Sequence, residues 1–219
     1  MRELRIRPRV KNLATSATLG MKAKARALEQ RGIRVIDMTA GEADFDTPRG
    51  VISRAQAALD EGATRYTPVR GTEELVAAMR DKFLRDQGVV VAENQVIATA
   101  GAKDALALAF DSLVGEGDEV VLLAPYWVSY PEQIRLVGGV PVIVPSTRAD
   151  GYLPRAESIA RAIGKNTRAI VVNTPNNPSG AVWPRRLLED LREVLKHTDA
   201  VLISDEIYER ILFDGLRHE

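Results

Sequence analysis

Polar side chains that could take part in chemistry follow several of the chain's apolar runs. Asp205 comes directly after the run of residues 200–204, and Tyr208 stands three residues further on. A carboxylate at the end of a buried strand is costly unless a cation pairs with it. A protonated heterocyclic nitrogen or a metal ion would serve, and the plainer alternative is that Asp205 caps a short helix.

The stretch NTPNNPSG follows a second apolar run and holds Asn177 between Asn176 and Pro178. Proline fixes its own φ angle, so Pro175 and Pro178 restrict this loop. A plain surface turn rarely needs so stiff a backbone with so many side-chain amides. We therefore expect the amide of Asn177 to be held in place for a ligand.

The segments after two further apolar runs offer an anion-binding site and a flat aromatic ring. Gly101 leads into a predicted helix that begins with Ala102 and Lys103, and a helix start favours a phosphate. The alternative is an ordinary turn with an exposed lysine; neither a Walker loop nor a GxGxxG fingerprint is present. Trp127, in a chain with 5% aromatic residues, could stack on a planar ring or pack between sheet and helix.

Together the residues that follow these apolar runs offer a phosphate-binding site, a flat aromatic ring, an amide and a carboxylate with a phenol beside it. That set suits a phosphorylated, planar, protonated heteroaromatic molecule. Pyridoxal 5'-phosphate fits, because a carboxylate at Asp205 would keep its ring nitrogen protonated and let the ring act as an electron sink.

Short β-branched runs alternate with amphipathic stretches along the chain. The runs predict strands at residues 33–39, 95–100, 119–124, 140–145, 168–173 and 200–204. The amphipathic stretches predict helices at residues 22–31, 49–61, 72–87, 102–114, 127–137, 155–163 and 184–197. This alternation indicates an α/β fold with a largely parallel sheet covered on both faces. Such sheets bind ligands beyond the carboxyl ends of their strands, where the polar residues above stand.

The composition narrows the class of protein. The 219 residues are 45% hydrophobic, with 30 basic and 30 acidic side chains, which is typical of a globular protein. The balanced charge argues against a nucleic-acid-binding face across the whole protein and leaves a local basic patch open. The chain has no cysteine, so disulfides and thiolate chemistry are excluded, and no metal site is predicted. No apolar run approaches the roughly 20 residues of a membrane span, and the basic N-terminus lacks the apolar region of a secretory signal. We expect a cytoplasmic protein without a membrane partner.

Seven motifs in order give the chain a resemblance to class I aminotransferases of the bacterial aspartate aminotransferase type, which are fold-type-I pyridoxal-phosphate enzymes. The motifs are SATLGMKAKA (16–25), TAGEADFDTP (39–48), TRYTPVRG (64–71), TAGAKDAL (99–106), PYWVSYPE (125–132), NTPNNPSG (173–180) and SDEIYE (204–209). The resemblance implies a three-layer α/β/α large domain that is incomplete at its C-terminus, over residues 46–219. Residues 1–45 would be an N-terminal arm and the start of the small domain.

The resemblance also implies roles for individual residues. The cofactor-binding residues would be Tyr66, Gly101, Ala102, Lys103, Trp127, Asn177, Asp205 and Tyr208. The substrate-binding residues would be Gly41, Lys103, Trp127 and Asn177. Asn177 and Tyr208 would bind the phenolic oxygen of the ring, and Asp205 its nitrogen. Gly41 would lie against the substrate α-carboxylate, and Tyr66 would reach the cofactor phosphate of a neighbouring subunit, which implies a homodimer.

The chain departs from the family pattern in its catalytic group. The family's Schiff-base lysine lies in a Ser/Lys-rich motif a few tens of residues after the SDEIY-like strand, and none of the lysines here stands in such a context. We therefore assign no catalytic residue, and we expect no transamination between aspartate and 2-oxoglutarate by the 219-residue chain alone.

Several functions stay open at this stage. The first is transfer of an amino group from an acidic amino acid, aspartate or glutamate, to a 2-oxo acid, with Lys103 as a contact for a dicarboxylic substrate. A prephenate or other aromatic acceptor is a variant of it. A dinucleotide-binding α/β protein and a non-catalytic cofactor-binding fragment are the alternatives from other classes.

Overall fold

The computed structural model describes residues 6–11, 13, 17–38, 41 and 45–219. Parts of the motifs at 16–25 and 39–48 therefore lie outside the described residues. The chain forms two compact units, Met1–Lys24 with Ala102–Glu219, and Ala25–Gly101. The predicted domain division after residue 45 stays a prediction. None of the helices in the described part of the chain is long and apolar enough to cross a membrane.

A parallel four-stranded sheet forms the centre of the first unit, which we call the sheet unit. Its strands are β1 (Glu119–Leu123), β2 (Val140–Val144), β3 (Thr167–Asn173) and β4 (Val201–Asp205). They lie in the order β2-β1-β3-β4, and all neighbouring pairs are parallel. The sheet unit also contains helices α1 (Pro8–Lys11), α5 (Ala102–Leu113), α6 (Ser129–Leu136), α7 (Ala156–Ala162) and α8 (Arg185–Leu195). A helix lies between each strand and the next along the chain, so the predicted strand–helix alternation is confirmed here.

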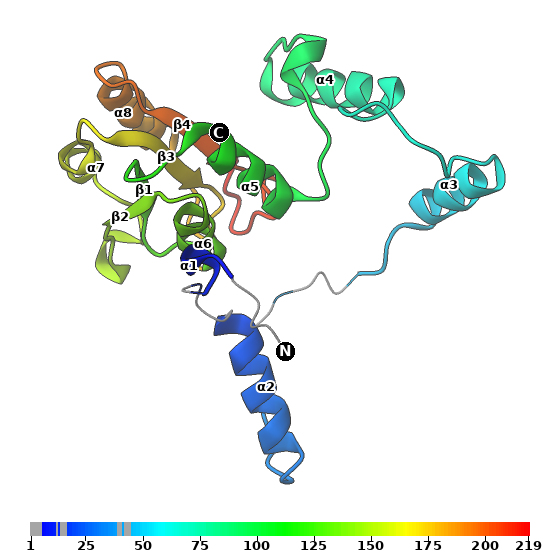
Figure 1. Ribbon diagram of the computed structural model, residues 1–219, viewed down its shortest axis with the longest axis horizontal. Helices are drawn as coiled ribbons and strands as arrows, with labels where there is room; N and C mark the ends of the chain where they lie inside the picture. The colour runs from blue at the N-terminus through cyan, green and yellow to red at the C-terminus, as the bar shows by residue number, and fades with distance from the viewer. Residues whose placement is uncertain (1–5, 12, 14–16, 39–40, 42–44) are drawn as a thin grey trace. The chain divides into compact units, whose positions relative to one another are not determined.

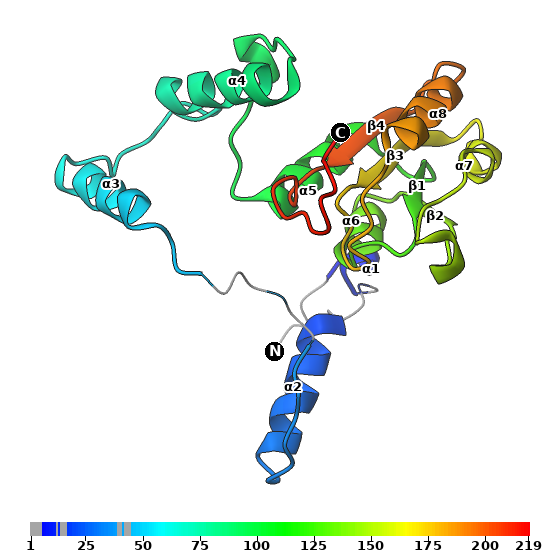
Figure 2. The same ribbon diagram turned by 180° about the vertical axis from the view of Figure 1, so that it is seen from behind.

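The central residues of β1 and β3 are apolar and buried because helices cover both faces of the sheet. Successive strand side chains point to opposite faces, so Val120 and Leu122 pack with α5 and α6 on one side. Val121 and Leu123 pack with α7 and α8 on the other. Figures 1 and 2 show these two helix pairs on either side of the strands. The predicted three-layer α/β/α architecture is confirmed.

The second unit, Ala25–Gly101, is helical. Helix α2 (Ala17–Glu29) crosses into it from the first unit, and α3 (Arg49–Asp60), α4 (Glu73–Gln87) and the short 3₁₀ helix η1 (Glu93–Gln95) follow. Helix α4 begins after Thr72, whose side-chain oxygen accepts a hydrogen bond from the Leu75 amide at 3.3 Å. It ends at Gly88, whose φ of 68° is the left-handed conformation that closes many helices.

Two predicted strands do not form. Residues 33–38 and 96–100 have neither helix nor strand structure, so the predictions at 33–39 and 95–100 are wrong for the described residues. A strand exists through hydrogen bonds to a neighbouring strand. Around residue 98 the Ala98 amide donates to the Arg70 carbonyl at 2.9 Å, but Arg70 lies in a turn rather than in a strand. The β-branched composition of both runs is thus not enough to form a strand where no neighbouring strand is available.

Candidate functional site

The carboxyl ends of β3 and β4 border a cavity of about 210 Å³ beside the start of α5. Its lining residues are Ala102, Lys103, Trp127, Tyr130, Asn173, Asn177, Asp205, Ile207 and Tyr208. Six of the predicted cofactor-binding residues are among them, and the cavity lies where a parallel sheet presents its ligands. The volume is below the roughly 300–1,000 Å³ of pockets for drug-sized molecules, so it suits a small ligand.

Asn177 and Tyr208, the two residues predicted to share one ligand oxygen, face each other. The side-chain Nδ2 of Asn177 donates a hydrogen bond to the Tyr208 hydroxyl at 3.2 Å. Asn177 belongs to the loop after β3, and Tyr208 to the turn after β4. Because β3 and β4 are parallel neighbours, their following segments leave the sheet side by side and bring these two side chains together.

Asp205 is the last residue of β4, and its carboxylate is half-buried at the edge of the cavity. Its Oδ2 accepts a hydrogen bond from the Tyr130 hydroxyl at 2.6 Å, and its Oδ1 accepts one from the Ile207 amide at 3.3 Å. Residues 207–210 form a turn, so the helix that Asp205 would cap is absent from this part of the chain.

Tyr130, which also lines the cavity, orients the carboxylate of Asp205. Burial raises the pKa of the Tyr130 hydroxyl well above its ordinary value, and the hydrogen bond to Asp205 and the charge of that carboxylate raise it further. The hydroxyl therefore stays protonated and keeps donating to Oδ2 of Asp205, while Oδ1 accepts from the Ile207 amide and retains a second lone pair for another donor.

The ring of Trp127 lines the cavity and also packs against the core, so the two interpretations of this residue are compatible. It meets the ring of Tyr130 edge to face, with the centroids 5.4 Å apart and the planes at 83°. The ammonium of Lys103 lies 5.0 Å from the centroid of the Trp127 indole, within the range of a cation–π contact. The cavity thus has an aromatic wall with a cation at its edge.

The predicted anion-binding site lies at the start of α5. Gly101 has a φ of 87°, a conformation that other residues rarely adopt, and it directly precedes the helix. Ala102 and Lys103 form the first turn and line the cavity. The backbone carbonyl of Lys103 accepts a hydrogen bond from the Gln133 side chain at 2.8 Å, which ties this turn to α6. Amide groups at a helix start suit an anion.

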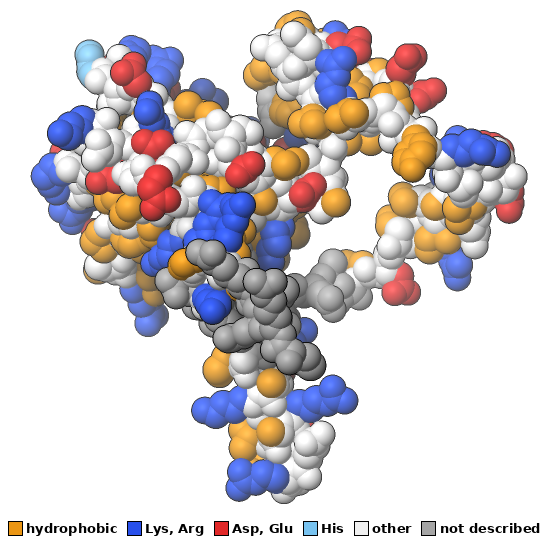
Figure 3. All heavy atoms as spheres, viewed as in Figure 1, with side chains coloured by type: hydrophobic (Ala, Val, Ile, Leu, Met, Phe, Trp, Pro, Cys, Tyr) orange, Lys and Arg blue, Asp and Glu red, His pale blue; other side chains and the backbone are white. Residues whose placement is uncertain are grey.

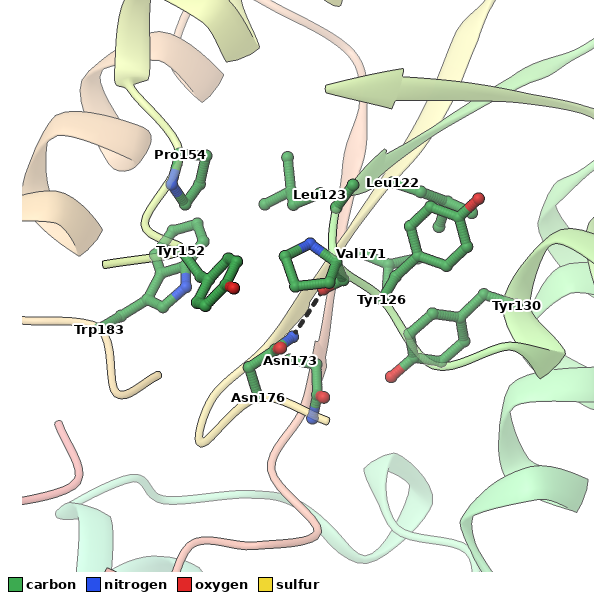
Figure 4. Close-up of a pocket in the computed structure, with 12 residues that line it drawn as sticks. Leu122, Leu123, Tyr126, Tyr130, Tyr152, Pro154, Val171, Asn173, Asn176 and Trp183 are labelled. Atoms are coloured by element: carbon green, nitrogen blue, oxygen red, sulfur yellow. Dashed lines mark hydrogen bonds between the residues drawn. The ribbon is translucent and has the colours of Figure 1, made fainter. Parts of the chain in front are cut away.

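Asn176 of the NTPNNPSG loop has a structural role. Nδ2 of Asn176 donates to the Pro125 carbonyl at 3.1 Å, the bond drawn in Figure 4, and its Oδ1 accepts from the amide and hydroxyl of Ser179. These bonds fasten the loop to the segment after β1. A second cavity at this place, with Tyr152 and Trp183 in its wall, measures about 10 Å³ and is too small for a planar ligand.

Three predicted site residues stand outside the list of cavity-lining residues. Gly101 is the last residue of the second unit and is joined directly to Ala102. Gly41 and Tyr66 belong to the same unit, whose position relative to the sheet unit is not determined. The roles of Gly41 and Tyr66 therefore stay predictions.

Two lining residues, Tyr130 and Asn173, were not predicted as site residues. Tyr130 is the second residue of α6, and Trp127 stands three positions earlier, just before that helix. Asn173 is the final residue of β3, and its amide is buried. A polar residue that ends an otherwise apolar run was the available signal for Asn173.

The sequence matches known proteins over almost its whole length. The family described as "Aminotransferase class I and II" matches residues 33–219. The chain is 45% identical, over 94% of its length and 54% of the relative's, to the aspartate/prephenate aminotransferase of Thermus thermophilus. It is 41% identical to the aspartate aminotransferase of Bacillus subtilis, over 98% of this chain and 55% of that protein.

Solved structures give the same similarity in three dimensions. The aspartate aminotransferase from Thermus thermophilus with maleate has a TM-score of 0.93 and 44% identity, and the match covers 100% of this chain and 57% of that one. For the aspartate aminotransferase from Rhizobium meliloti the TM-score is 0.94 at 36% identity, over 98% of this chain and 54% of that one. The chain therefore spans about half the length of the relatives it matches.

Proposed function

The chain belongs to the aminotransferase class I and II family, and we propose that it is the N-terminal part of a pyridoxal-phosphate-dependent aminotransferase. The reaction is transfer of an amino group from an acidic amino acid, aspartate or glutamate, to a 2-oxo acid. Such a protein serves amino acid metabolism and biosynthesis, and we propose a cytoplasmic location for it.

The observation that carries the proposal is the convergence of Asn177, Tyr208 and Asp205 on one cavity beside the ring of Trp127. An amide and a phenol suit a phenolic oxygen, a carboxylate suits a protonated ring nitrogen, and an indole suits the face of a flat ring. This donor set fits pyridoxal 5'-phosphate. When bound, the cofactor supplies an electron sink.

Each residue then has one task toward the cofactor. Asp205 holds the proton at the ring nitrogen, and Tyr130 orients Asp205 through the bond at 2.6 Å. Asn177 donates to the phenolic oxygen from the same Nδ2 that bonds Tyr208. The start of α5 holds the phosphate through the amide groups of Ala102 and Lys103, the helix dipole and the charge of the Lys103 ammonium.

The substrate is proposed to be a dicarboxylate. The cation of Lys103 at the edge of the aromatic wall suits a second carboxylate, and a similar structure from Thermus thermophilus holds maleate, which is a dicarboxylate. Gly41 is proposed to lie against the α-carboxylate and Trp127 and Asn177 to contact the substrate. Relatives named aspartate/prephenate aminotransferase make prephenate the second candidate acceptor.

The protein is proposed to act as a homodimer in which Tyr66 reaches the cofactor phosphate of the neighbouring subunit. The Tyr66 side chain is fully exposed, at 107% of its reference area, and so is accessible to a partner. Figure 3 shows further hydrophobic side chains at the surface of α3 and α4. Apolar surface of this kind is typical of a region that a partner covers.

Equilibrium dialysis of the purified chain tests the proposed cofactor. Pyridoxal 5'-phosphate should be retained more strongly than pyridoxal, which lacks the phosphate. Lys103→Ala should reduce this preference by roughly tenfold, because a hydrogen bond to a charged group contributes about 1.5–3 kcal/mol. Arg168→Gln is the control, because Arg168 pairs with Asp118 outside the cavity. Retention of NAD in place of pyridoxal 5'-phosphate would instead indicate a dinucleotide-binding protein.

A further inference from the structure

Asn173 connects the two segments that carry the cavity's polar groups. Its side-chain Oδ1 accepts a hydrogen bond from the Asn177 backbone amide at 2.7 Å. Its Nδ2 donates to the backbone carbonyl of Asp205 at 2.9 Å. The residue is 6% exposed, and a buried amide that loses a partner is costly, so both bonds are strongly favoured.

The Asn173 side chain lies at the point where the pairing of β3 and β4 ends. Asn173 and Asp205 are the last register pair of β3 and β4, and beyond it a backbone bond of 3.3 Å joins the Thr174 amide to the Asp205 carbonyl. Asn177 then lies four residues past the end of β3. The side chain of Asn173 therefore links the Asn177 backbone to Asp205 beyond the last register pair of the sheet.

We infer that Asn173 is a positioning residue that sets Asn177 and Asp205 at the spacing of one rigid ring, an inference that rests on the proposed function. Asn177 and Asp205 are proposed to contact the phenolic oxygen and the ring nitrogen of the same ligand. A rigid ring satisfies both contacts only when the two protein groups are held within about 0.5 Å of the required geometry. Asn173 fulfils this by bonding both segments at once.

Thr174 offers a matched control on the next residue. It is buried like Asn173, but its Oγ1 accepts a hydrogen bond from the Trp183 amide at 2.9 Å, and it does not line the cavity. Thr174→Val thus removes a buried side-chain hydrogen bond at the same end of β3 and keeps the backbone bond from the Thr174 amide to Asp205. A merely structural effect should appear in both variants.

The test compares three ligands by equilibrium dialysis against the full chain. They are pyridoxal 5'-phosphate, its analogue without the phenolic hydroxyl, and its analogue with CH in place of the ring nitrogen. Wild type should prefer pyridoxal 5'-phosphate over each analogue by about tenfold or more, as expected for hydrogen bonds to charged groups. In Asn173→Ala both preferences should fall to about threefold or less, whereas Thr174→Val should keep them.

Asn173→Asp separates the two halves of the role. Its carboxylate keeps an oxygen that accepts from the Asn177 amide, so the preference over the analogue without the phenolic hydroxyl should return part of the way to the wild-type value. The return is partial because the added charge repels an ionised phenolic oxygen, which this analogue lacks. Failure of this rescue would count against the inference.

The outcomes distinguish the inference from the proposed function. Equal weakening of all three ligands in Asn173→Ala would mean a structural role only and would overturn the inference. If the wild-type chain binds pyridoxal 5'-phosphate no more strongly than either analogue, the proposed contacts are wrong. The inference is then wrong as well, because it rests on those contacts. Amide hydrogen exchange without ligand gives a second readout: Asn177 should exchange at least about tenfold faster in Asn173→Ala than in Thr174→Val, and equal rates would contradict the inference.

Discussion

The two compact units of the chain bury their apolar side chains to different degrees. In the sheet unit, Phe110 and Ile134 are 0% exposed and pack directly under the strands. In Ala25–Gly101, Leu59 is 62% and Val69 91% exposed, and the buried apolar residues found among its described positions are Val76 and Val96. The elements that line the cavity are therefore supported by a hydrophobic core within the sheet unit. The exposed apolar residues of the second unit, in contrast, need another surface to cover them.

This difference separates two kinds of site residue. Asn177, Asp205 and Tyr208 are placed by hydrogen bonds and packing within the sheet unit. Gly41 and Tyr66 stand on a unit without comparable support, and their proposed contacts depend on assembly. The residues that line the cavity thus belong to the sheet unit, and four predictions test this difference between the units.

The largest expected effect is on stability. Phe110→Ala should reduce the free energy of unfolding by about 3–5 kcal/mol, because it leaves a cavity among fully buried side chains. Leu59→Ala, on exposed helix surface, should change it by less than about 0.5 kcal/mol. Urea denaturation followed by circular dichroism measures both. Equal losses of unfolding free energy in the two variants would show that the second unit has a core of its own.

The next effect concerns cofactor affinity. Asp205→Asn should weaken binding of pyridoxal 5'-phosphate by roughly 30-fold or more, since loss of one member of a buried charge pair costs about 2–5 kcal/mol. Tyr66→Phe should have no effect on the monomer, and should weaken binding only at protein concentrations where a dimer forms. Dialysis at two protein concentrations checks this. An equally large loss in monomeric Tyr66→Phe would break the contrast between the units.

A smaller effect depends on pH. The pKa of Tyr130 is raised in the folded protein, so its contribution to stability is complete below the ordinary tyrosine value of about 10 and is lost as pH rises above it. Between pH 10 and 11 this loss amounts to about 1 kcal/mol. Tyr130→Phe should remove that part of the pH dependence, which denaturation at both pH values would detect. Identical slopes in the two proteins would contradict the assigned burial of the hydroxyl.

The smallest effect on folding is expected in the second unit. Val69→Ser should change the free energy of unfolding by less than about 0.5 kcal/mol, because the side chain is already in solvent. If a partner subunit covers this region, the same substitution should lower the dimer fraction seen by sedimentation velocity. An unchanged fraction would remove Val69 from the proposed interface.

The sheet unit could be predicted well from the sequence because its pattern is local. Four apolar runs, each separated from the next by a helical stretch, correspond to β1–β4, and the parallel arrangement follows from that alternation. The runs at 33–39 and 95–100 have similar composition but lack a partner strand in the described residues. Pairing is a long-range property, and composition does not encode it.

The site was predictable to the extent that strand ends define it. Asp205 and Asn177 follow neighbouring parallel strands, so their meeting at one edge could be expected. The tasks of Tyr130 and Asn173 could not, because they depend on where a side chain points after packing. Their bonds to Asp205, at 2.6 Å from Tyr130 and 2.9 Å from Asn173, become visible only in three dimensions.

The protonation state of the bound ring nitrogen tests the central claim most directly. Nitrogen-15 NMR of pyridoxal 5'-phosphate labelled at that atom, bound to the chain at pH 8, should show a protonated nitrogen held by Asp205. In Asp205→Asn the same nitrogen should lose its proton, whereas in Thr174→Val it should keep it. A nitrogen signal equal to that of the free cofactor in the wild-type chain, or one unchanged by Asp205→Asn, would contradict the account.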